Sequence, residues 1–90
     1  MTIIYKYPLS LNGLDQTIEM PSGSRILVVG GQHGEPVLLA QVDTDAKPCK
    51  RVFVVVGTGH HVPPNDSGLP GYVGTAFCDP FVWHVYEVTL

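Results

Sequence analysis

The sequence predicts an all-β fold, a small antiparallel barrel or sandwich of six to seven short strands. Runs rich in β-branched and aromatic residues recur along the chain, turn residues separate them at regular intervals, and no window has the period of an α-helix. The only helical element expected is one short turn near Asn65–Ser67. Ninety residues without a linker or repeat predict a single domain, 1–90. Strands are expected at 3–7, 16–20, 25–29, 36–42, 50–56, 71–77 and 81–88.

The first four strands follow from local pattern and turn chemistry. The first run is β-branched or aromatic at most positions and ends at Pro8. The second, Gln16–Met20, alternates polar and apolar residues, as a half-buried strand does. The third and fourth are joined by Gly30–Glu35, a hairpin connection in which the double glycine Gly30–Gly31 predicts a β-bulge.

The last three strands are apolar at most positions. The turn Asp43–Pro48 precedes the run Arg51–Val56, and the tight connection Cys78–Pro80 joins the final two strands. Trp83 and His84 are adjacent in a strand and must face opposite sides of it, so one faces the core and the other faces solvent or a partner. Most of the aromatic residues on these strands are expected in the core: Tyr5, Tyr7, Phe53, Tyr72, Phe77, Phe81, Trp83 and Tyr86.

The charge of the chain argues against several classes of protein. Charged residues make up 14% of the chain, below the roughly 25% of an average globular protein, and the net charge is −3. Of the basic residues only Lys47, Lys50 and Arg51 cluster, so direct nucleic-acid binding is not expected. No apolar run approaches the roughly 18 residues of a membrane span, and no signal peptide is recognisable. Cys49 and Cys78 are isolated, which predicts two free thiols in a cytosolic protein.

The best candidate binding site is the loop at 57–66, where the apolar run 51–56 stops abruptly. It begins Gly57, Thr58, Gly59, His60 and His61, and prolines follow. Glycine N–H groups converge readily on an anion, and Arg51 or Arg25 would supply positive charge. The alternative is a bend at the rim of the barrel, the commoner role of glycine in strands.

Neither a metal site nor a catalytic site is expected. His33, His60, His61 and His84 lack metal-ligand spacing, and adjacent histidines in an extended chain point to opposite faces. No serine lies in a nucleophile elbow. We therefore predict a protein that is not an enzyme and carries no cofactor or metal.

Self-association is expected through the end of the chain. Residues 82–90 are apolar at most positions, whereas a strand with one buried face should alternate more cleanly. Either this strand is central in its sheet, or one face meets another subunit. The interface candidates are Val82, Trp83, His84 and Tyr86, in a homo-oligomer built through this strand or its neighbour.

The chain resembles a family of short, uncharacterised proteins encoded by tailed phages and prophages. The matching segments span nearly its whole length and include Ile4–Pro8, Gln16–Gly23, Gly57–His60, Tyr72–Thr75 and Val82–Glu87. The resemblance implies a phage origin and a location in the cytoplasm of the infected bacterium. It brings no catalytic residue with it.

Three functions fit these observations. The working hypothesis is a non-catalytic antagonist of a host defence system that covers a host protein with the 57–66 loop and an edge strand. The first alternative is a sponge in which the same loop sequesters a nucleotide-like immune signal. The second is an accessory or morphogenesis protein without an immune role.

Overall fold

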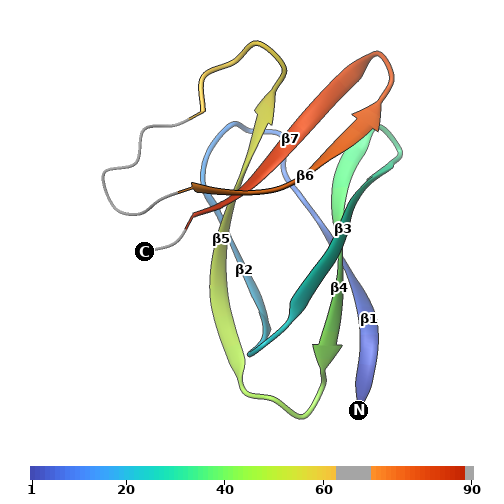
Figure 1. The fold of residues 1–90 in the computed structure, drawn as a ribbon, viewed down its shortest axis with the longest axis vertical. Helices are drawn as coiled ribbons and strands as arrows, with labels where there is room; N and C mark the ends of the chain where they lie inside the picture. Colours follow the sequence, from blue (N-terminus) through green and yellow to red (C-terminus); the bar gives the residue numbers. More distant parts are fainter. Residues whose placement is uncertain (63–69, 89–90) are drawn as a thin grey trace.

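All regular secondary structure in the described chain is β-strand. The computed structural model describes residues 1–62 and 70–88 (Figure 1). The helical turn expected near Asn65–Ser67 and the residues of the loop from 63 onward lie outside the described residues. The strands are β1 (Thr2–Pro8), β2 (Gln16–Pro21), β3 (Arg25–Gln32), β4 (Glu35–Asp43), β5 (Pro48–Gly57), β6 (Pro70–Cys78) and β7 (Phe81–Val88).

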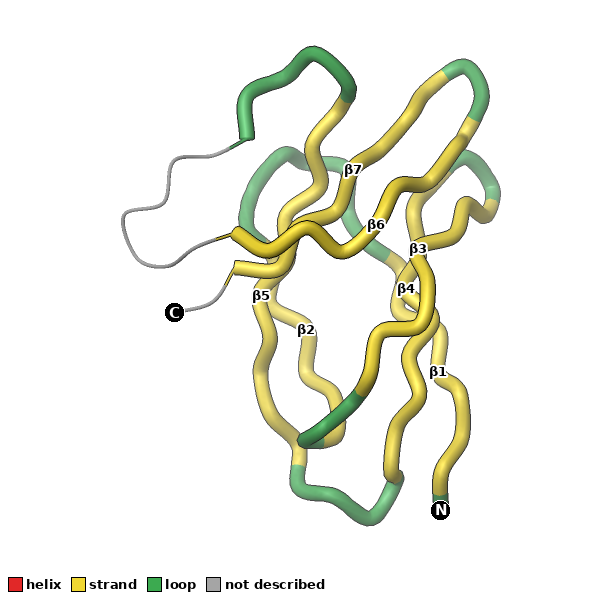
Figure 2. Tube along the Cα trace, viewed as in Figure 1, coloured by secondary structure: helices red, strands yellow, loops and turns green. Residues whose placement is uncertain are grey.

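The strands form two antiparallel sheets that pack face to face. One sheet has the order β1-β4-β3 and the other has the order β2-β5-β7-β6 (Figures 1 and 2). The predicted all-β fold is therefore confirmed, and of the two predicted forms the structure is a small sandwich. Neither the part before nor the part after residues 63–69 contains a helix of the length and apolar character that a bilayer span requires.

The core lies where alternate residues of the two sheets meet. Leu38 on β4, Phe53 and Val55 on β5, and Val85 on β7 are buried in one cluster with Met20. On β4 the buried positions Leu38, Ala40 and Val42 recur every second residue, because successive side chains of a strand point to opposite faces.

The β3–β4 hairpin closes in a two-residue turn, and its bulge is not where the sequence predicted it. His33 and Gly34 both have positive φ, 54° and 79°, as a turn matched to the strand twist requires. The bulge lies between Ile26 and Val28, so the prediction of a bulge at the double glycine is wrong. Gly30 and Gly31 instead continue the regular pairing with β4.

The glycine at 31 allows two strands of different sheets to approach closely. A Cβ on Gly31 would lie 2.7 Å from Cys78 Sγ and 3.2 Å from the carbonyl oxygen of Phe77. A similar contact lies further along β6, where a Cβ on Gly74 would lie 2.8 Å from a methyl carbon of Val29. β3 and β6 therefore pack directly on one another and close one side of the sandwich.

The aromatic residues do not fill the core as predicted. Phe53 is fully buried, and Tyr7 and Trp83 pack against the core cluster from its margin. In contrast, Tyr5, Tyr72, Phe77 and Phe81 are exposed. The valines, Leu38 and Met20 fill the narrow space between the sheets instead, which leaves these large rings at the strand ends and edges.

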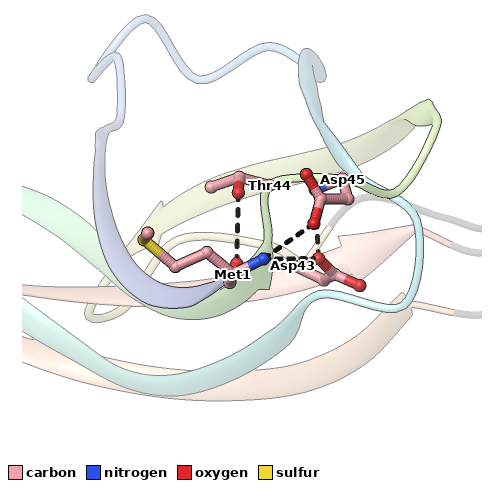
Figure 3. Close-up of polar contacts among 4 residues, drawn as sticks. All are labelled: Met1, Asp43, Thr44 and Asp45. Carbon is pink, nitrogen blue, oxygen red and sulfur yellow. Dashed lines mark hydrogen bonds and ion pairs between the residues drawn. The ribbon is translucent and has the colours of Figure 1, made fainter.

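The amine of Met1 fastens the start of β1 to the turn after β4. It donates to Asp45 Oδ2 at 2.9 Å and to Asp43 Oδ1 at 3.4 Å, and the Thr44 hydroxyl donates to Met1 O at 3.2 Å (Figure 3). Thr44 N also donates to Met1 O, at 2.9 Å. The hydrogen bond to Asp45 raises the pKa of the amine, and the contacts with Asp43 raise it further. The hydrogen bond from Asp45 N, and then the one from the amine, lower the pKa of Asp43.

These shifts predict a small dependence of stability on pH, fullest between about pH 4 and pH 8. The raised pKa of the Met1 amine means that its contribution is complete at lower pH and is lost as the pH rises past the folded value. The lowered pKa of Asp43 means that its contribution to stability is complete near neutral pH and is lost as the pH falls past the folded value. Asp45→Asn should therefore flatten the alkaline loss in urea unfolding midpoints measured from neutral pH to roughly pH 10. If the midpoint of Asp45→Asn fell with rising pH as steeply as that of the wild type, the contact between Asp45 and the Met1 amine would not be the cause of the alkaline loss.

Candidate functional site

The loop after β5 is a tight turn rather than an open anion cradle. His60 N donates to the carbonyl of Gly57 at 3.0 Å, and Gly59 has a φ of 87°, which favours glycine. Thr58 N points at the carbonyl of Val82 on β7, at 3.4 Å. Because these N–H groups already have partners, the turn does not offer them to a phosphate. The geometry favours the bend at the rim over the anion-binding interpretation.

Beside this turn lies a pocket of about 430 Å³ between the ends of β5 and β7. Phe81 and Trp83 form its aromatic part, with ring centroids 5.6 Å apart and planes at 29°. Gly57 has no side chain to fill the space: a Cβ there would lie 2.9 Å from His60 Nδ1 and 3.3 Å from the Trp83 ring. The pocket is lined by Gly57, Thr58, His60, Pro80, Phe81, Val82 and Trp83.

Trp83 also carries an unsatisfied polar group. Its indole Nε1 is buried and has no hydrogen-bond partner among the described residues. Buried side-chain donors almost always have one, so such an atom marks a place where packing or function overrides the usual pairing. The ring itself packs against the core cluster, which fixes its position.

His84 lies on the other face of β7 and is held by hydroxyl groups. Thr58 Oγ1 lies 2.8 Å from its Nε2, and Thr75 Oγ1 lies 3.1 Å from its Nδ1. These contacts tie the end of β5 to β7 and β6. A smaller hollow of about 210 Å³ lies against this face, between His60, Val62 and Tyr86. His60 therefore separates two recesses.

The tip of the β6–β7 hairpin carries two exposed aromatic rings that the sequence analysis assigned to the core. Phe77 is 79% exposed and Phe81 is 57% exposed. They lie on either side of the Asp79–Pro80 turn, so the hairpin carries both to the same end of the molecule (Figure 1). Phe77 lies between the buried residues Ala76 and Cys78, so strand alternation turns it to the outer face of its sheet. For Phe81 the signal available in the sequence was its nearness to the tight turn.

The two arginines proposed to serve the loop lie elsewhere. Arg51 is six residues before Gly57 on β5, or about 20 Å along the strand. It pairs with Glu87 and lines, with Arg25, a separate cavity of about 450 Å³ beside Ser24 and Tyr72. The structure thus divides the predicted site within one chain, where neither arginine lines the recesses beside the 57–61 loop, and charge supplied to the loop from Arg51 or Arg25 of another subunit stays a prediction.

The interface candidates on β7 are also divided. Trp83 lies on one face of the strand, and Val82, His84 and Tyr86 lie on the other. Val82 and Trp83 both line the pocket at the start of β7, whereas His84 and Tyr86 line the smaller hollow. β7 lies between β5 and β6 in its sheet, and both of its edges are paired. β7 is therefore central in its sheet, the first of the two arrangements expected from its apolar run, and self-association through one of its faces or through a neighbouring strand stays a prediction.

His61 is exposed and follows the turn after β5. His33 lies in the β3–β4 turn, far along the chain from His60 and His61. Within residues 1–62 and 70–88, no three histidine, cysteine or acidic side chains come together as metal ligands would. Cys49 is half-buried and Cys78 is buried, and both are free thiols.

A family model described as a domain of unknown function, DUF7352, matches residues 1–90. The chain belongs to the DUF7352 family. A search of curated proteins and a search of solved structures give no match. The function of this DUF7352 domain must therefore be argued from its own geometry.

The pocket of the DUF7352 domain can be perturbed at Gly57. Gly57→Ala places a methyl group 2.9 Å from the His60 ring, which lies in an exposed loop and can turn away. We expect His60 to leave the pocket wall and the Trp83 ring, 3.3 Å from the new Cβ, to shift slightly, at a cost in stability of about 1 kcal/mol. The check is the chemical shift of the His60 ring protons, measured beside an unfolding midpoint that changes little. Retention of the wild-type shifts would contradict the model of the pocket.

Proposed function

We propose that this DUF7352 domain is a non-catalytic module that binds one protein partner stoichiometrically through its aromatic rim. We define the aromatic rim as Phe77, Phe81, Trp83, Val82 and His60. The observation that carries the proposal is the exposure of Phe77 and Phe81 at one hairpin tip, with Phe81 stacked on Trp83 in the wall of a pocket.

Exposed rings at such a position suit a binding anchor. Removing a phenylalanine side chain from water is worth about 1.5–3 kcal/mol. Burial of two such side chains against a partner would therefore contribute a large part of a binding free energy. Aromatic side chains next to a well-formed pocket dominate the energetics of many protein interfaces. A pocket of about 430 Å³ has the size to receive one or two apolar side chains of a partner.

The chemistry of the histidines supports binding rather than catalysis. His84 contacts only hydroxyl groups through its ring nitrogens, and no carboxylate among the described residues orients it. A threonine–histidine pair without such an orienting group lacks the third member of an activated nucleophile. The proposal therefore assigns no reaction to the site.

We further propose that the partner is a host protein and that binding blocks a bacterial defence system in the cytoplasm of an infected cell. This step rests on the resemblance to phage and prophage proteins, and it is an argument by analogy. The low charge of the domain leaves the aromatic rim as the main source of affinity.

The sponge alternative has one supporting feature, the stacked Phe81 and Trp83 rings, which could hold a planar base. It lacks a nearby cation from the predicted set, because Arg51 is engaged with Glu87 at the other end of β5. A thermal-shift screen with cyclic nucleotides and ADP-ribose derivatives separates the two ideas. A shift of the midpoint with one of these ligands would favour the sponge.

Phe81→Asp should lower the affinity for the purified partner by about tenfold or more, because it puts a charge in place of a buried anchor. The matched control is Leu27→Asp, an exposed apolar residue on β3 in the other sheet, which should leave the affinity unchanged. The chain has one tryptophan, so a change in Trp83 emission on titration reports occupation of the pocket directly. Equal binding by both variants would refute the site.

Phage plating separates the antagonist from the accessory alternative. The antagonist should restore plating only on hosts that carry one particular defence system, and Phe81→Asp should lose this effect. An accessory or morphogenesis protein should change plating equally on hosts with and without defence systems.

A further inference from the structure

The orientation of backbone groups along β1 follows from two hydrogen bonds at its ends. Thr44 N donates to Met1 O at 2.9 Å, and Leu9 N donates to Pro36 O at 3.0 Å. In an antiparallel pair the residues that exchange hydrogen bonds recur every second position. The odd-numbered residues of β1 therefore face β4, and the even-numbered residues present their N–H and C=O groups on the opposite side.

That opposite side is a free sheet edge. β1 is the outermost strand of its sheet, at the right of Figure 2. The outward backbone groups belong to Thr2, Ile4 and Lys6, and no other part of the described chain bonds to them. Pro8 occupies the next outward position and has no N–H, so the edge ends there.

The other edges are less available. β3 and β6 pack against each other. On β2 the bond from Ser22 N to Lys47 O shows that the even-numbered residues bond to β5. The residues whose backbone groups point outward are therefore Thr17, Glu19 and Pro21. That edge combines a charged side chain with a proline, two devices that discourage pairing.

A charged residue such as Lys6 normally discourages pairing at a sheet edge, but here the Lys6 side chain points away from the free edge. Its Nζ donates to Gln32 Oε1 on β3 at 2.6 Å, so the side chain reaches across β4 and away from the free edge. At the centre of the edge, Ile4 is 61% exposed. The middle of the β1 edge is therefore apolar, unpaired and unguarded by charge.

We propose that a second copy of this chain pairs with the β1 edge in antiparallel fashion, about a two-fold axis at Ile4. In this register Ile4 faces Ile4 of the second copy, and Thr2 faces Lys6 in both directions. All the outward residues that carry an N–H then exchange hydrogen bonds, because even-numbered positions meet even-numbered positions. The two β1-β4-β3 sheets become one continuous sheet.

Hydrogen bonding selects this register over the one with its axis at Lys6. An axis at Lys6 would set Ile4 opposite Pro8, which has no N–H, and would bring the two lysine backbones directly opposite each other. With the axis at Ile4, the two lysines are four residues apart along the strand, about 13 Å. That distance exceeds the Debye length of about 8 Å at physiological ionic strength, so their repulsion is largely screened.

The side chains next to the edge also suit a second copy. Tyr5, which is exposed, and Ile3 lie on the inner face of β1 and would meet Ile3 and Tyr5 of the second copy. The contacts of Met1 with the turn at Asp43–Asp45 hold the start of the strand in place before pairing (Figure 3). The edge is therefore preorganised and needs little further ordering.

The test is Ile4→Pro, measured by light scattering and sedimentation over roughly 10 to 500 µM, the range expected for an interface at the small end of specific sizes. The wild-type mass should rise toward two chains. Proline at position 4 removes an outward N–H and none of the N–H groups that bond to β4, and the φ that it fixes is one that Pro8 already adopts at its own outward position. We expect dimerisation to weaken by about tenfold or more.

Thr17→Pro is the matched control, since it removes an outward N–H from the β2 edge in the same way. It should leave the dimer unchanged. Unfolding midpoints of both variants confirm that each is folded. A wild-type chain that stays monomeric throughout, or a dimer that Ile4→Pro leaves intact, would overturn the proposal. A dimer lost only in Thr17→Pro would assign the interface to β2 and also overturn it.

Discussion

Arg51→Met should lower the free energy of unfolding by about 2 to 3 kcal/mol. Arg51 Nε and Nη2 donate to the two carboxylate oxygens of Glu87 at 2.7 and 2.8 Å, and Nη1 donates to the carbonyl of Ser24 at 2.6 Å. The hydrogen bonds to Glu87 raise the pKa of Arg51. Methionine keeps much of the packing against Phe53 but leaves a half-buried carboxylate and a carbonyl without their donor.

Urea unfolding against Lys50→Met checks this prediction. Lys50 is the preceding residue on β5 and is exposed, so its loss should cost less than about 0.5 kcal/mol. Adding Glu87→Gln to Arg51→Met should recover part of the loss, since it removes the unpaired charge. Equal effects of Arg51→Met and Lys50→Met would show that the ion pair contributes no more than a surface charge.

Gly74→Ala should cost about 1 to 3 kcal/mol, because the sandwich has no room for one more carbon between β6 and β3. The new Cβ would lie 2.8 Å from Val29 Cγ2 and 3.1 Å from Val29 Cβ. Val29 is buried, so it cannot simply turn into solvent. The strands must move apart, or Val29 must leave its rotamer.

Two controls separate this overpacking from the general effect of replacing a glycine. Gly30→Ala places its Cβ 3.7 Å from a methyl carbon of Val37, an ordinary contact, and should be neutral or slightly stabilising. In a Val29→Ala background the added cost of Gly74→Ala should largely disappear, which a double-mutant cycle on unfolding free energies measures. A full cost in that background would place the strain elsewhere.

The strands were predictable because they depend on local chemistry. The β-branched runs and the turns between them gave every strand, and the largest difference is at β3, which ends at Gln32 rather than at residue 29. Turn residues were also reliable, because the His33–Gly34 turn needs backbone conformations that few residues adopt.

The arrangement of the strands and the site were not predictable, because they depend on contacts between distant residues. Nothing local to Arg51 indicates Glu87, which is 36 residues away, and the pairing of the two placed Arg51 far from the loop it was expected to serve. The bulge shows the same limit: Gly31 is a glycine because β6 passes close by, not because its own strand is irregular. Phe77 and Phe81 lie in apolar runs like core residues, but Phe77 faces outward between the buried Ala76 and Cys78, and Phe81 begins β7 beside the turn.

The place of β7 in its sheet has a consequence for how the protein is made. It follows every other strand in the sequence, yet it lies between β5 and β6 and bonds to both. The β6–β7 hairpin must therefore form and dock on β5 before the four-stranded sheet is whole, and a nascent chain on the ribosome cannot complete its core until Val85 has emerged. Folding of this domain therefore waits for β7, and its rate is set by long-range strand pairing rather than by any early local element.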